Sequence, residues 1–345
     1  MRNSIIRVLC VDDSAFVRKI LTDELGRQPD IRVVACANDP IEARDVLLSQ
    51  EVDVMILDVE MPRMDGITFL EQLMAKRPMP VVMFSTLTQQ GGEMAMRALS
   101  LGAVDVVGKP TNLAAMRNLG VELAEKVRVA AAVDVTRHRP SFISKPQSLG
   151  GGGIYRRPLL LLGASTGGTE ALRAVFAELP ADTPGTLVVQ HMPAHFTHSF
   201  AQSLDRVSAM TVREAKDGDL VQRGVALVAP GGLHMVVEGS PAAMRVRLKE
   251  GPPVCHQKPA VDVLFKSAAR GLGQQAVAAV LTGMGHDGAD GIVELKRAGT
   301  LTVAQDALTS VVYGMPRAAK ETGCVDQVVS LQNIARTVLE LLTHR

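Results

Sequence analysis

Short apolar runs alternate with amphipathic segments along the first part of the chain. Strands of a parallel sheet appear as continuous apolar runs because helices cover both faces of the sheet. The segments between the runs carry apolar residues at helical spacing, which predicts repeated βα units. The predicted strands are Ile5–Val11, Val33–Ala37, Val54–Leu57, Val81–Phe84 and Val104–Val107. We therefore expect a doubly wound, flavodoxin-like domain with a five-stranded parallel sheet.

Polar side chains come directly after four of these strands. Because the carboxyl ends of parallel strands meet at one edge of a sheet, the side chains are expected to lie together. Three carboxylates at short range repel one another, and Mg²⁺ with oxygen ligands is the usual resolution. The residues are Asp12 and Asp13 after the first strand, Asp58 after the third, Ser85 after the fourth and Lys109 after the fifth.

This set suits phosphoryl transfer to a carboxylate. Asp58 is the candidate nucleophile, Lys109 would pair with phosphate oxygens, and Ser85 would donate a hydroxyl hydrogen bond. The alternative for each residue alone is a helix cap or a solvated lysine. Their joint placement at four strand ends favours the phosphoryl-transfer interpretation.

The periodicity stops after about residue 130. Residues 131–157 are rich in proline, serine, glycine and arginine and include four consecutive glycines, so we interpret them as a flexible linker. Phe142, Ile143 and Ile154 are its candidate docking residues. The predicted domains are accordingly 1–130 and 158–345.

The second domain opens with an apolar strand and a turn dense in small residues, Pro158–Leu172. Gly163, Ser165 and Gly167 form a G-x-S-x-G pattern, in which glycines allow a sharp turn with positive φ that exposes a nucleophilic serine. A tight turn with an ordinary exposed serine explains the pattern equally well. Further strands are predicted at Leu187–Gln190 and Val277–Leu281, and a helix at Glu170–Leu179.

Two further residues complete a candidate catalytic triad. His191 follows the second of these strands and could act as general base, and Asp287 follows the third and could orient the histidine. The order Ser, His, Asp differs from that of α/β-hydrolases and of chymotrypsin-like proteases.

The same segments have two alternative interpretations. A dinucleotide loop at residues 163–168 lacks the G-x-G-x-x-G spacing. A zinc site at His191, His195 and His198 is opposed by Pro193, which interrupts the helix that would align the ligands. The histidines at 195, 198, 234, 256 and 286 are expected on the surface or in loops, with His256 lining the cleft.

Composition narrows the class of protein. The chain has 345 residues, 47% of them hydrophobic and 21% charged, with a formal net charge of +1, so neither nucleic acid nor a membrane surface is the expected partner. Four cysteines without a C-x-x-C pair indicate neither a zinc ribbon nor a disulfide framework. With no signal peptide and no apolar run long enough to span a bilayer, a cytoplasmic location is expected.

Sequence motifs of the chain resemble those of two protein families. VDDSAFVR, LDVEMPRMDG and GKP resemble response-regulator receiver domains over about residues 1–130. GASTGGTEAL, VVQHMP, VAPGGLHM, GPPV, PAVDVLF, LTGMGHDG and YGMPRAA resemble the CheB protein-glutamate methylesterase family over residues 158–345, with a mainly parallel, Rossmann-like sheet expected there.

The receiver resemblance implies phosphorylation of Asp58 and Mg²⁺ held by Asp12, Asp13 and Asp58. The methylesterase resemblance implies Ser165 as nucleophile, His191 as base and Asp287 as acid, with the amide of Met284 as oxyanion donor and Thr166 as support. Receivers often place an aromatic switch residue where this chain has Val106, which makes coupling through aromatic rotation doubtful.

Together the two resemblances imply a phosphorylation-activated serine hydrolase. Its substrates would be glutamate methyl esters and selected glutamines of methyl-accepting chemotaxis receptors, and a chemotaxis histidine kinase would donate the phosphoryl group. No metal is expected in the catalytic domain, and the expected oligomeric state is a monomer. The alternative from another class is a receiver joined to a non-catalytic protein-binding or DNA-binding module.

Overall fold

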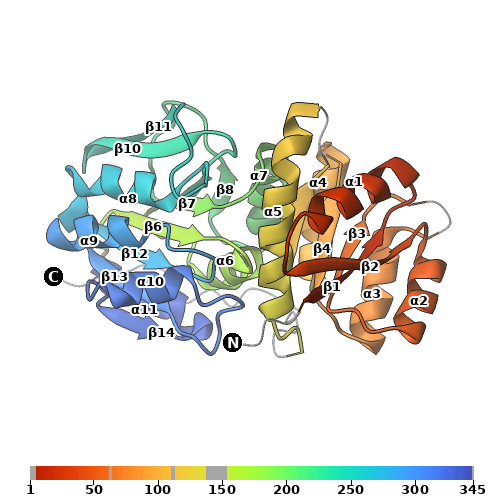
Figure 1. Cartoon of the computed structure of the whole chain (residues 1–345). Helices are drawn as coiled ribbons and strands as arrows, with labels where there is room; N and C mark the ends of the chain where they lie inside the picture. Colours follow the sequence, from red (N-terminus) through yellow and green to blue (C-terminus); the bar gives the residue numbers. More distant parts are fainter. Residues whose placement is uncertain (1–4, 62–63, 87, 110–112, 137–153, 344–345) are drawn as a thin grey trace. The chain divides into compact units, whose positions relative to one another are not determined.

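The computed structural model describes residues 5–61, 64–86, 88–109, 113–136 and 154–343. The chain divides into two compact units, Met1–Pro140 and Ser141–Arg345. Each unit is built around a parallel sheet of its own (Figure 1).

The sheet of the first unit has five parallel strands in the order β2-β1-β3-β4-β5. Every predicted strand is present, with ends displaced by no more than two residues because strands continue beyond their apolar stretch. The strands are β1 (Ile6–Val11), β2 (Ile31–Ala37), β3 (Val54–Asp58), β4 (Val81–Ser85) and β5 (Asp105–Gly108). The predicted doubly wound receiver fold is confirmed.

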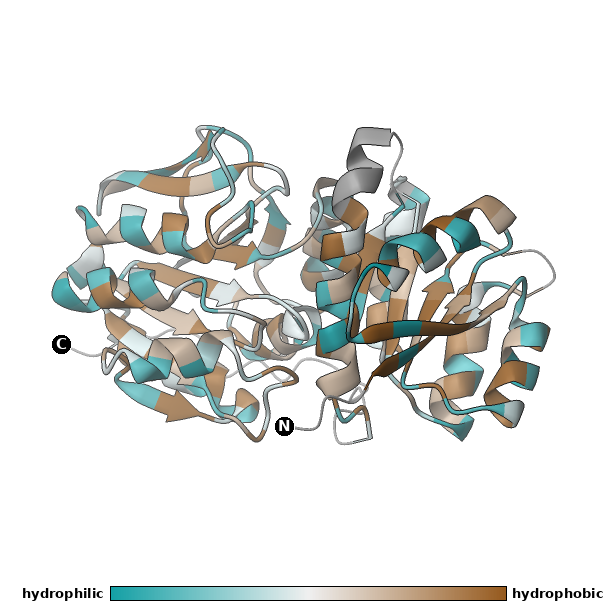
Figure 2. Cartoon of the chain, in the orientation of Figure 1, coloured by the Kyte–Doolittle hydropathy of each residue, from teal (hydrophilic) through white to brown (hydrophobic). Residues whose placement is uncertain are grey.

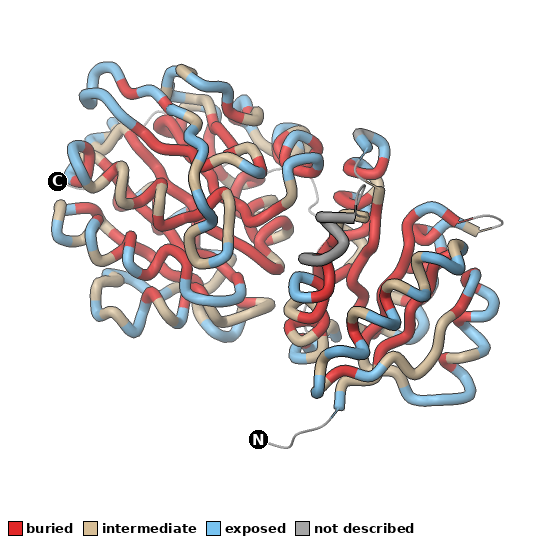
Figure 3. The backbone as a smooth tube through the Cα atoms, turned by 45° about the horizontal axis from the view of Figure 1, so that its top comes forward, coloured by how far each residue is buried: buried red, intermediate tan, exposed pale blue. Residues whose placement is uncertain are grey.

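Within the described residues, five helices cover this sheet, with α1 packed against α5 and α3 against α4. They are α1 (Ala15–Gly26), α2 (Pro40–Ser49), α3 (Gly66–Lys76), α4 (Gln89–Ser100) and α5 (Leu113–Ala132). The first four begin at a side-chain N-cap, provided by Ser14, Asp39, Asp65 and Thr88. The hydrophobic strands between more polar helices form the buried core (Figures 2 and 3).

The sheet of the second unit has seven parallel strands in the order β14-β13-β12-β6-β7-β9-β8. Its strands are β6 (Leu159–Ala164), β7 (Gly185–Gln190), β8 (Thr211–Glu214), β9 (Val225–Val228), β12 (Ala276–Val280), β13 (Leu301–Gln305) and β14 (Gln327–Val329). The chain passes from β6 to β7 on one side and later reaches β12 on the other side. The carboxyl end of β6 is therefore a topological switch point, where α/β proteins bind ligands.

Helices and one antiparallel hairpin complete the second unit. The helices are α6 (Gly168–Glu178), α7 (Ala194–Asp205), α8 (Val261–Ala269), α9 (Ala289–Arg297), α10 (Met315–Glu321) and α11 (Leu331–Thr343), with a short 3₁₀ turn at Gly273–Gln275. The hairpin pairs β10 (His234–Ser240) with β11 (Ala243–Lys249). Side chains from α8, α9, α10, this hairpin and the sheet form one hydrophobic core.

Helix α5 extends through Ala132, so the residues just after 130 are helical rather than irregular. Most of the predicted linker, residues 137–153 with Phe142 and Ile143, lies outside the described residues. Ile154 is described and is 85% exposed, so within the described residues it is a solvent-facing side chain.

Candidate active site and acidic cluster

Three loops of the second unit meet at the carboxyl end of β6. In the sheet, Gly163 pairs with Val280 on one side and with Val189 on the other. Beyond the strands, Ser165 N donates to Thr282 O at 3.0 Å, and the amide of His191 donates to Ala164 O at 3.1 Å. These hydrogen bonds hold the segments that carry Ser165, His191 and Asp287 side by side.

Ser165 lies in a turn that is held by its own carbonyl group. This oxygen accepts from Gly168 N at 2.7 Å and from Gln190 Nε2 at 2.8 Å. The residue with positive φ is Gly167, at 77°, and among the described non-glycine residues only Cys255 and His256 have positive φ. In the turn predicted from the glycine pattern, the residue with left-handed backbone conformation is therefore Gly167, two residues after the serine and directly before α6.

Gly283 permits the closest approach to Ser165. A Cβ atom at this position would lie 2.7 Å from Ser165 Cβ and 2.4 Å from Met315 Sδ, both shorter than real carbon contacts. Any side chain at residue 283 would thus push against the serine. Glycine is therefore required at position 283 because a Cβ atom would collide with its neighbours, and not because of the backbone φ angle.

His191 and Asp287 form a buried pair. His191 Nε2 lies 2.8 Å from Asp287 Oδ2, and the two residues are 7% and 1% exposed. His191 Nδ1 is buried and has no hydrogen-bond partner among the described residues. With Nε2 protonated and bonded to the carboxylate, Nδ1 is the nitrogen free to accept a proton.

The first amides of α8 hold the Asp287 carboxylate. Val261 N donates to Oδ2 at 2.6 Å, and Asp262 N donates to Oδ1 at 2.9 Å. Burial alone would raise the pKa of Asp287, but the hydrogen bond and charge of His191 and these two amides outweigh burial and lower its pKa. The helix N-terminus therefore helps to keep this acid ionised.

Asp262 connects α8 to the loop that carries Asp287. Its Oδ1 accepts from Gly288 N at 3.0 Å and from Gly291 N at 2.7 Å, and the residue is 2% exposed. Helix α9 has no side-chain cap from Gly288, its own N-cap residue, so Asp262 serves that purpose from a neighbouring helix. Sequence reasoning missed this residue because nothing in the spacing relates positions 262 and 288.

The predicted oxyanion group is accessible. Among the described residues, the amide of Met284 has no hydrogen-bond acceptor, and the residue is 40% exposed. Thr166 is 4% exposed, and its carbonyl oxygen accepts from Thr282 Oγ1 at 3.0 Å. Within the described part of the chain, Ser165 makes no side-chain hydrogen bond to His191, so the structure joins two members of the predicted triad directly and places the third beside them.

The remaining histidines are mostly where they were expected. His195 and His198 are exposed on α7, and His256 and His286 are exposed in loops. The expectation for His234 is wrong, because this residue lies in β10, is 4% exposed, and Nε2 contacts Pro252 O at 3.0 Å. A single histidine at the start of a strand gives no sequence signal that distinguishes burial from exposure.

In the first unit, the three predicted aspartates converge. One carboxylate oxygen from each of Asp12, Asp13 and Asp58 lies within 4.8 Å of the others. Asp12 and Asp58 are buried and Asp13 is exposed. A set of carboxylate oxygens open to solvent on one side fits Mg²⁺, which takes oxygen ligands and retains some of its water.

Lys109 bridges two of these carboxylates. Its Nζ lies 2.8 Å from Asp12 Oδ2 and 2.8 Å from Asp58 Oδ2. Burial raises the pKa of Asp58 to about 6, because the attraction of Lys109 offsets only part of the cost of burying the charge. The predicted lysine is thus in direct contact with the predicted phosphorylation site.

Ser85 is also at this edge and is fully buried. Its hydroxyl donates to Gly91 O at 3.2 Å. The hydroxyl is therefore engaged with the backbone of α4, and contact with a phosphoryl group would require it to exchange that partner.

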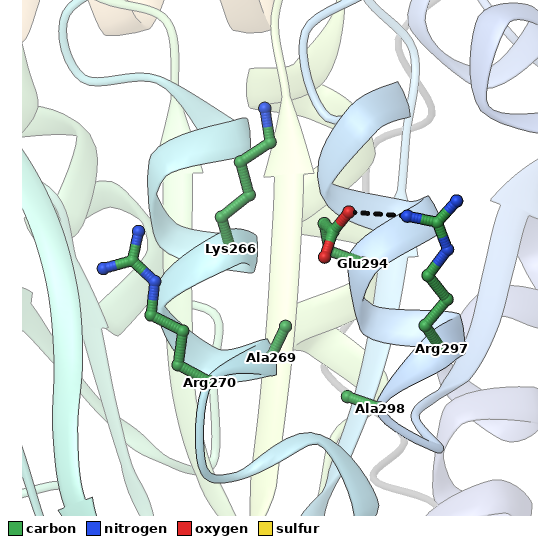
Figure 4. Close-up of a pocket in the computed structure, with 6 residues that line it drawn as sticks. All are labelled: Lys266, Ala269, Arg270, Glu294, Arg297 and Ala298. Atoms are coloured by element: carbon green, nitrogen blue, oxygen red, sulfur yellow. Dashed lines mark hydrogen bonds and ion pairs between the residues drawn. The ribbon is translucent and has the colours of Figure 1, made fainter.

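A separate pocket of about 470 Å³ lies between the carboxyl ends of α8 and α9 (Figure 4). Basic side chains at helix carboxyl ends interact favourably with the unpaired carbonyl groups there. Asp287 contacts the opposite end of α8, so this pocket is not part of the catalytic arrangement. Its lining residues are Lys266, Ala269, Arg270, Glu294, Arg297 and Ala298.

The fold and these sites define a class: a receiver domain joined to an α/β domain with a buried His–Asp pair beside a serine at the switch point. Family models agree, since the response regulator receiver domain matches residues 8–119 and CheB methylesterase matches residues 160–338. The chain belongs to the CheB methylesterase family.

Similar proteins span the whole chain. A protein-glutamate methylesterase/protein-glutamine glutaminase 2 of Syntrophus aciditrophicus is 46% identical over 340 residues, covering 98% of this chain and 99% of that protein. The protein-glutamate methylesterase/protein-glutamine glutaminase of Bordetella bronchiseptica is 48% identical over 345 residues, covering 99% and 98%. The crystal structure of the Thermotoga maritima CheB methylesterase catalytic domain is 35% identical, with a TM-score of 0.52, covering 56% of this chain and 100% of that one.

The receiver linked to a methylesterase-type domain favours the enzyme over the non-catalytic alternative. None of the helices in the described part of the chain is both long enough and apolar enough to cross a membrane.

Proposed function

We propose that this chain hydrolyses glutamate methyl esters, and deamidates selected glutamines, on methyl-accepting chemotaxis receptors. The observation that carries the proposal is the buried hydrogen bond between His191 and Asp287, at the strand edge where Ser165 follows β6. A buried, ionised carboxylate paired with an otherwise unpartnered imidazole is the arrangement that a general base requires.

In the proposed acylation step, Ser165 Oγ attacks the ester carbonyl carbon while His191 Nδ1 accepts the hydroxyl proton. Asp287 stabilises the imidazolium through its hydrogen bond with Nε2. The amide of Met284 donates to the developing oxyanion, with Thr166 supporting the serine loop. His191 then protonates the leaving methoxide, and methanol departs.

In deacylation, water attacks the acyl-serine ester and His191 again accepts a proton. The tetrahedral intermediate collapses to glutamate, and Ser165 recovers its proton from the imidazolium. A glutamine side chain follows the same path with ammonia as the leaving group, so one set of residues serves both reactions.

For the receiver, we propose that Asp58 accepts a phosphoryl group from a chemotaxis histidine kinase and that this raises hydrolase activity. Asp12, Asp13 and Asp58 would hold Mg²⁺, which supplies charge neutralisation for the incoming phosphoryl group. Lys109 and Ser85 would contact the phosphate oxygens. The cytoplasmic location, the monomeric state and a linker between the end of α5 at Ala132 and the start of β6 at Leu159 complete the proposal.

The test of the catalytic proposal is methanol release from methylated receptor membranes by the purified full chain. Ser165→Ala should lose at least about three orders of magnitude in rate, because the covalent step is removed. Ser203→Ala is the control, since that hydroxyl only donates to a carbonyl within α7. Retention of more than about a tenth of the wild-type rate by Ser165→Ala would refute the assignment of the nucleophile.

The test of the receiver proposal is the response of the same assay to a small phosphodonor. Asp58→Asn should keep the basal rate and lose the response, because an amide cannot form an acyl phosphate. Incorporation of phosphate at another carboxylate, mapped by mass spectrometry in this variant, would contradict the assignment of Asp58.

A further inference from the structure

Two cysteines that lie far apart in the sequence are neighbours in the receiver sheet. Cys10 of β1 pairs in register with Cys36 of β2. Residues paired in register on adjacent parallel strands point to the same face, and the strands are about 4.8 Å apart. This spacing falls within the range of about 4.4 to 6.8 Å between Cα atoms that a disulfide bridges.

The two thiols differ in their surroundings. Cys10 is completely buried, whereas Cys36 is only partly buried. Thr22 of α1, which packs on this face, places its Oγ1 3.4 Å from Cys36 Sγ. One thiol is thus shielded from solvent and the other is open to a small reagent.

The charges and hydrogen bonds around Cys36 favour its thiolate. The neighbouring Cys10 thiol, together with Thr22 and the nearby Arg18, lowers the pKa of Cys36 to about 6, although its burial and the charge of Glu42 oppose this. An accessible thiolate beside a second thiol is the arrangement found in thiol pairs that react with oxidants.

We propose that Cys36 and Cys10 form a peroxide-reactive dithiol in the receiver domain. The Cys36 thiolate attacks one oxygen of hydrogen peroxide, which breaks the O–O bond and gives the sulfenic acid and hydroxide. The Cys10 sulfur then attacks the Cys36 sulfur and forms the S–S bond. The Cys10 proton and the sulfenic hydroxyl leave together as water, so two thiols are oxidised while one peroxide is reduced.

The proposed disulfide lies next to the acidic cluster. Cys10 lies on β1, two residues before Asp12, which follows the strand. The amide of Asp12 donates to the carbonyl oxygen of Ala37, the residue after Cys36, at 3.2 Å. Oxidation would therefore cross-link β1 and β2 next to the backbone hydrogen bond between Asp12 and Ala37. Asp12 is one of the predicted magnesium ligands.

The remaining cysteines provide internal controls. Cys255 and Cys324 belong to the second unit and are partly buried, as Cys36 is. Burial and neighbouring carboxylates raise the pKa of Cys255. At pH 7 we therefore expect Cys36 to be alkylated at least about tenfold faster than Cys255.

The experiment uses the full chain with Cys255→Ser and Cys324→Ser, which leaves only the proposed pair. After hydrogen peroxide treatment, excess iodoacetamide and trypsin, a non-reduced digest should contain residues 8–18 joined to residues 33–44, because arginines flank both peptides. Dithiothreitol should separate them. When dimedone is added with the peroxide, Cys10→Ser in this background should form no disulfide and should carry a dimedone adduct at Cys36. Cys36→Ser should leave Cys10 with neither a disulfide nor a dimedone adduct.

Two results would overturn the proposal. The first is absence of the dimedone adduct in the Cys10→Ser variant, which would mean that Cys36 is not reactive. The second is a cross-link that forms no faster in the native chain than in urea, which would mean that strand pairing does not bring the thiols together. Circular dichroism of each untreated variant establishes that the comparison is made on folded protein.

Discussion

The contact between Asp262 and the start of α9 leads to a quantitative prediction. Asp262 Oδ1 is the acceptor for two amides, those of Gly288 and Gly291, and the side chain is almost completely buried. Asp262→Ala leaves both donors without an acceptor. At about 1 to 2 kcal/mol for each buried donor, the loss should be about 2 to 4 kcal/mol in unfolding free energy.

Asp262→Asn provides a sharper comparison. The amide oxygen of asparagine can accept from the same two donors, and burial already raises the pKa of Asp262, so its negative charge stabilises the fold little. We expect a loss below about 1.5 kcal/mol for Asn, clearly smaller than for Ala. Lys266→Met is the control for the ion pair, because the lysine is 36% exposed and contacts Asp262 at 3.3 Å, which predicts a change under about 1 kcal/mol.

The assay is urea unfolding followed through the transition of the second unit, together with the methanol-release rate. Displacement of the loop that carries Asp287 should lower the turnover of Asp262→Ala about a hundredfold, since displacements near 1 Å have such effects in catalytic sites. Equal stability of the Ala and Asn variants would refute the reasoning, because it would show that the two amide hydrogen bonds do not support the fold.

Three other substitutions test separate contacts. Gly283→Ala should lower the unfolding free energy by about 1 to 3 kcal/mol and remove most of the methanol-release activity, because the added Cβ would meet Ser165. Gly271→Ala is the control and should be tolerated, because nothing lies within 4 Å of a Cβ there. Equal effects of the two substitutions would contradict this prediction. Gln190→Leu removes the side-chain amide that donates to Ser165 O and should lower the rate of methanol release. Substrate affinity is measured as the control. An unchanged rate would contradict this prediction. Asp58 has a pKa of about 6 in the folded chain and about 4 in the unfolded chain, so the folded chain binds its proton more tightly. The unfolding free energy therefore falls as the pH rises from about 4 to about 6. Asp58→Asn in metal-free buffer should therefore stabilise the chain by about 1 kcal/mol more at pH 8 than at pH 5, and an equal gain at both would contradict this.

The amino-acid sequence determined the strands and the edge where polar residues gather. Continuous apolar runs are typical of strands that are covered on both faces, so β1–β7 and β12 could be located to within two residues. Because parallel strands end at a common edge, the position of Ser165, His191 and Asp58 at strand ends could be predicted from the order of the residues along the chain. The strands β8, β9, β13 and β14 and the hairpin β10–β11 were not predicted. The edge strands β8 and β14 are short and partly exposed and lack a continuous apolar run.

Tertiary structure alone decided which residues support those groups. The amides that hold Asp287 come from α8, and the acceptor that caps α9 is Asp262, although these partners are 25 to 29 residues apart. Likewise Cys10 and Cys36 become neighbours only through the register of β1 with β2. Periodicity reports how each segment meets solvent, whereas such contacts depend on how segments are placed in three dimensions, and no local pattern contains that information.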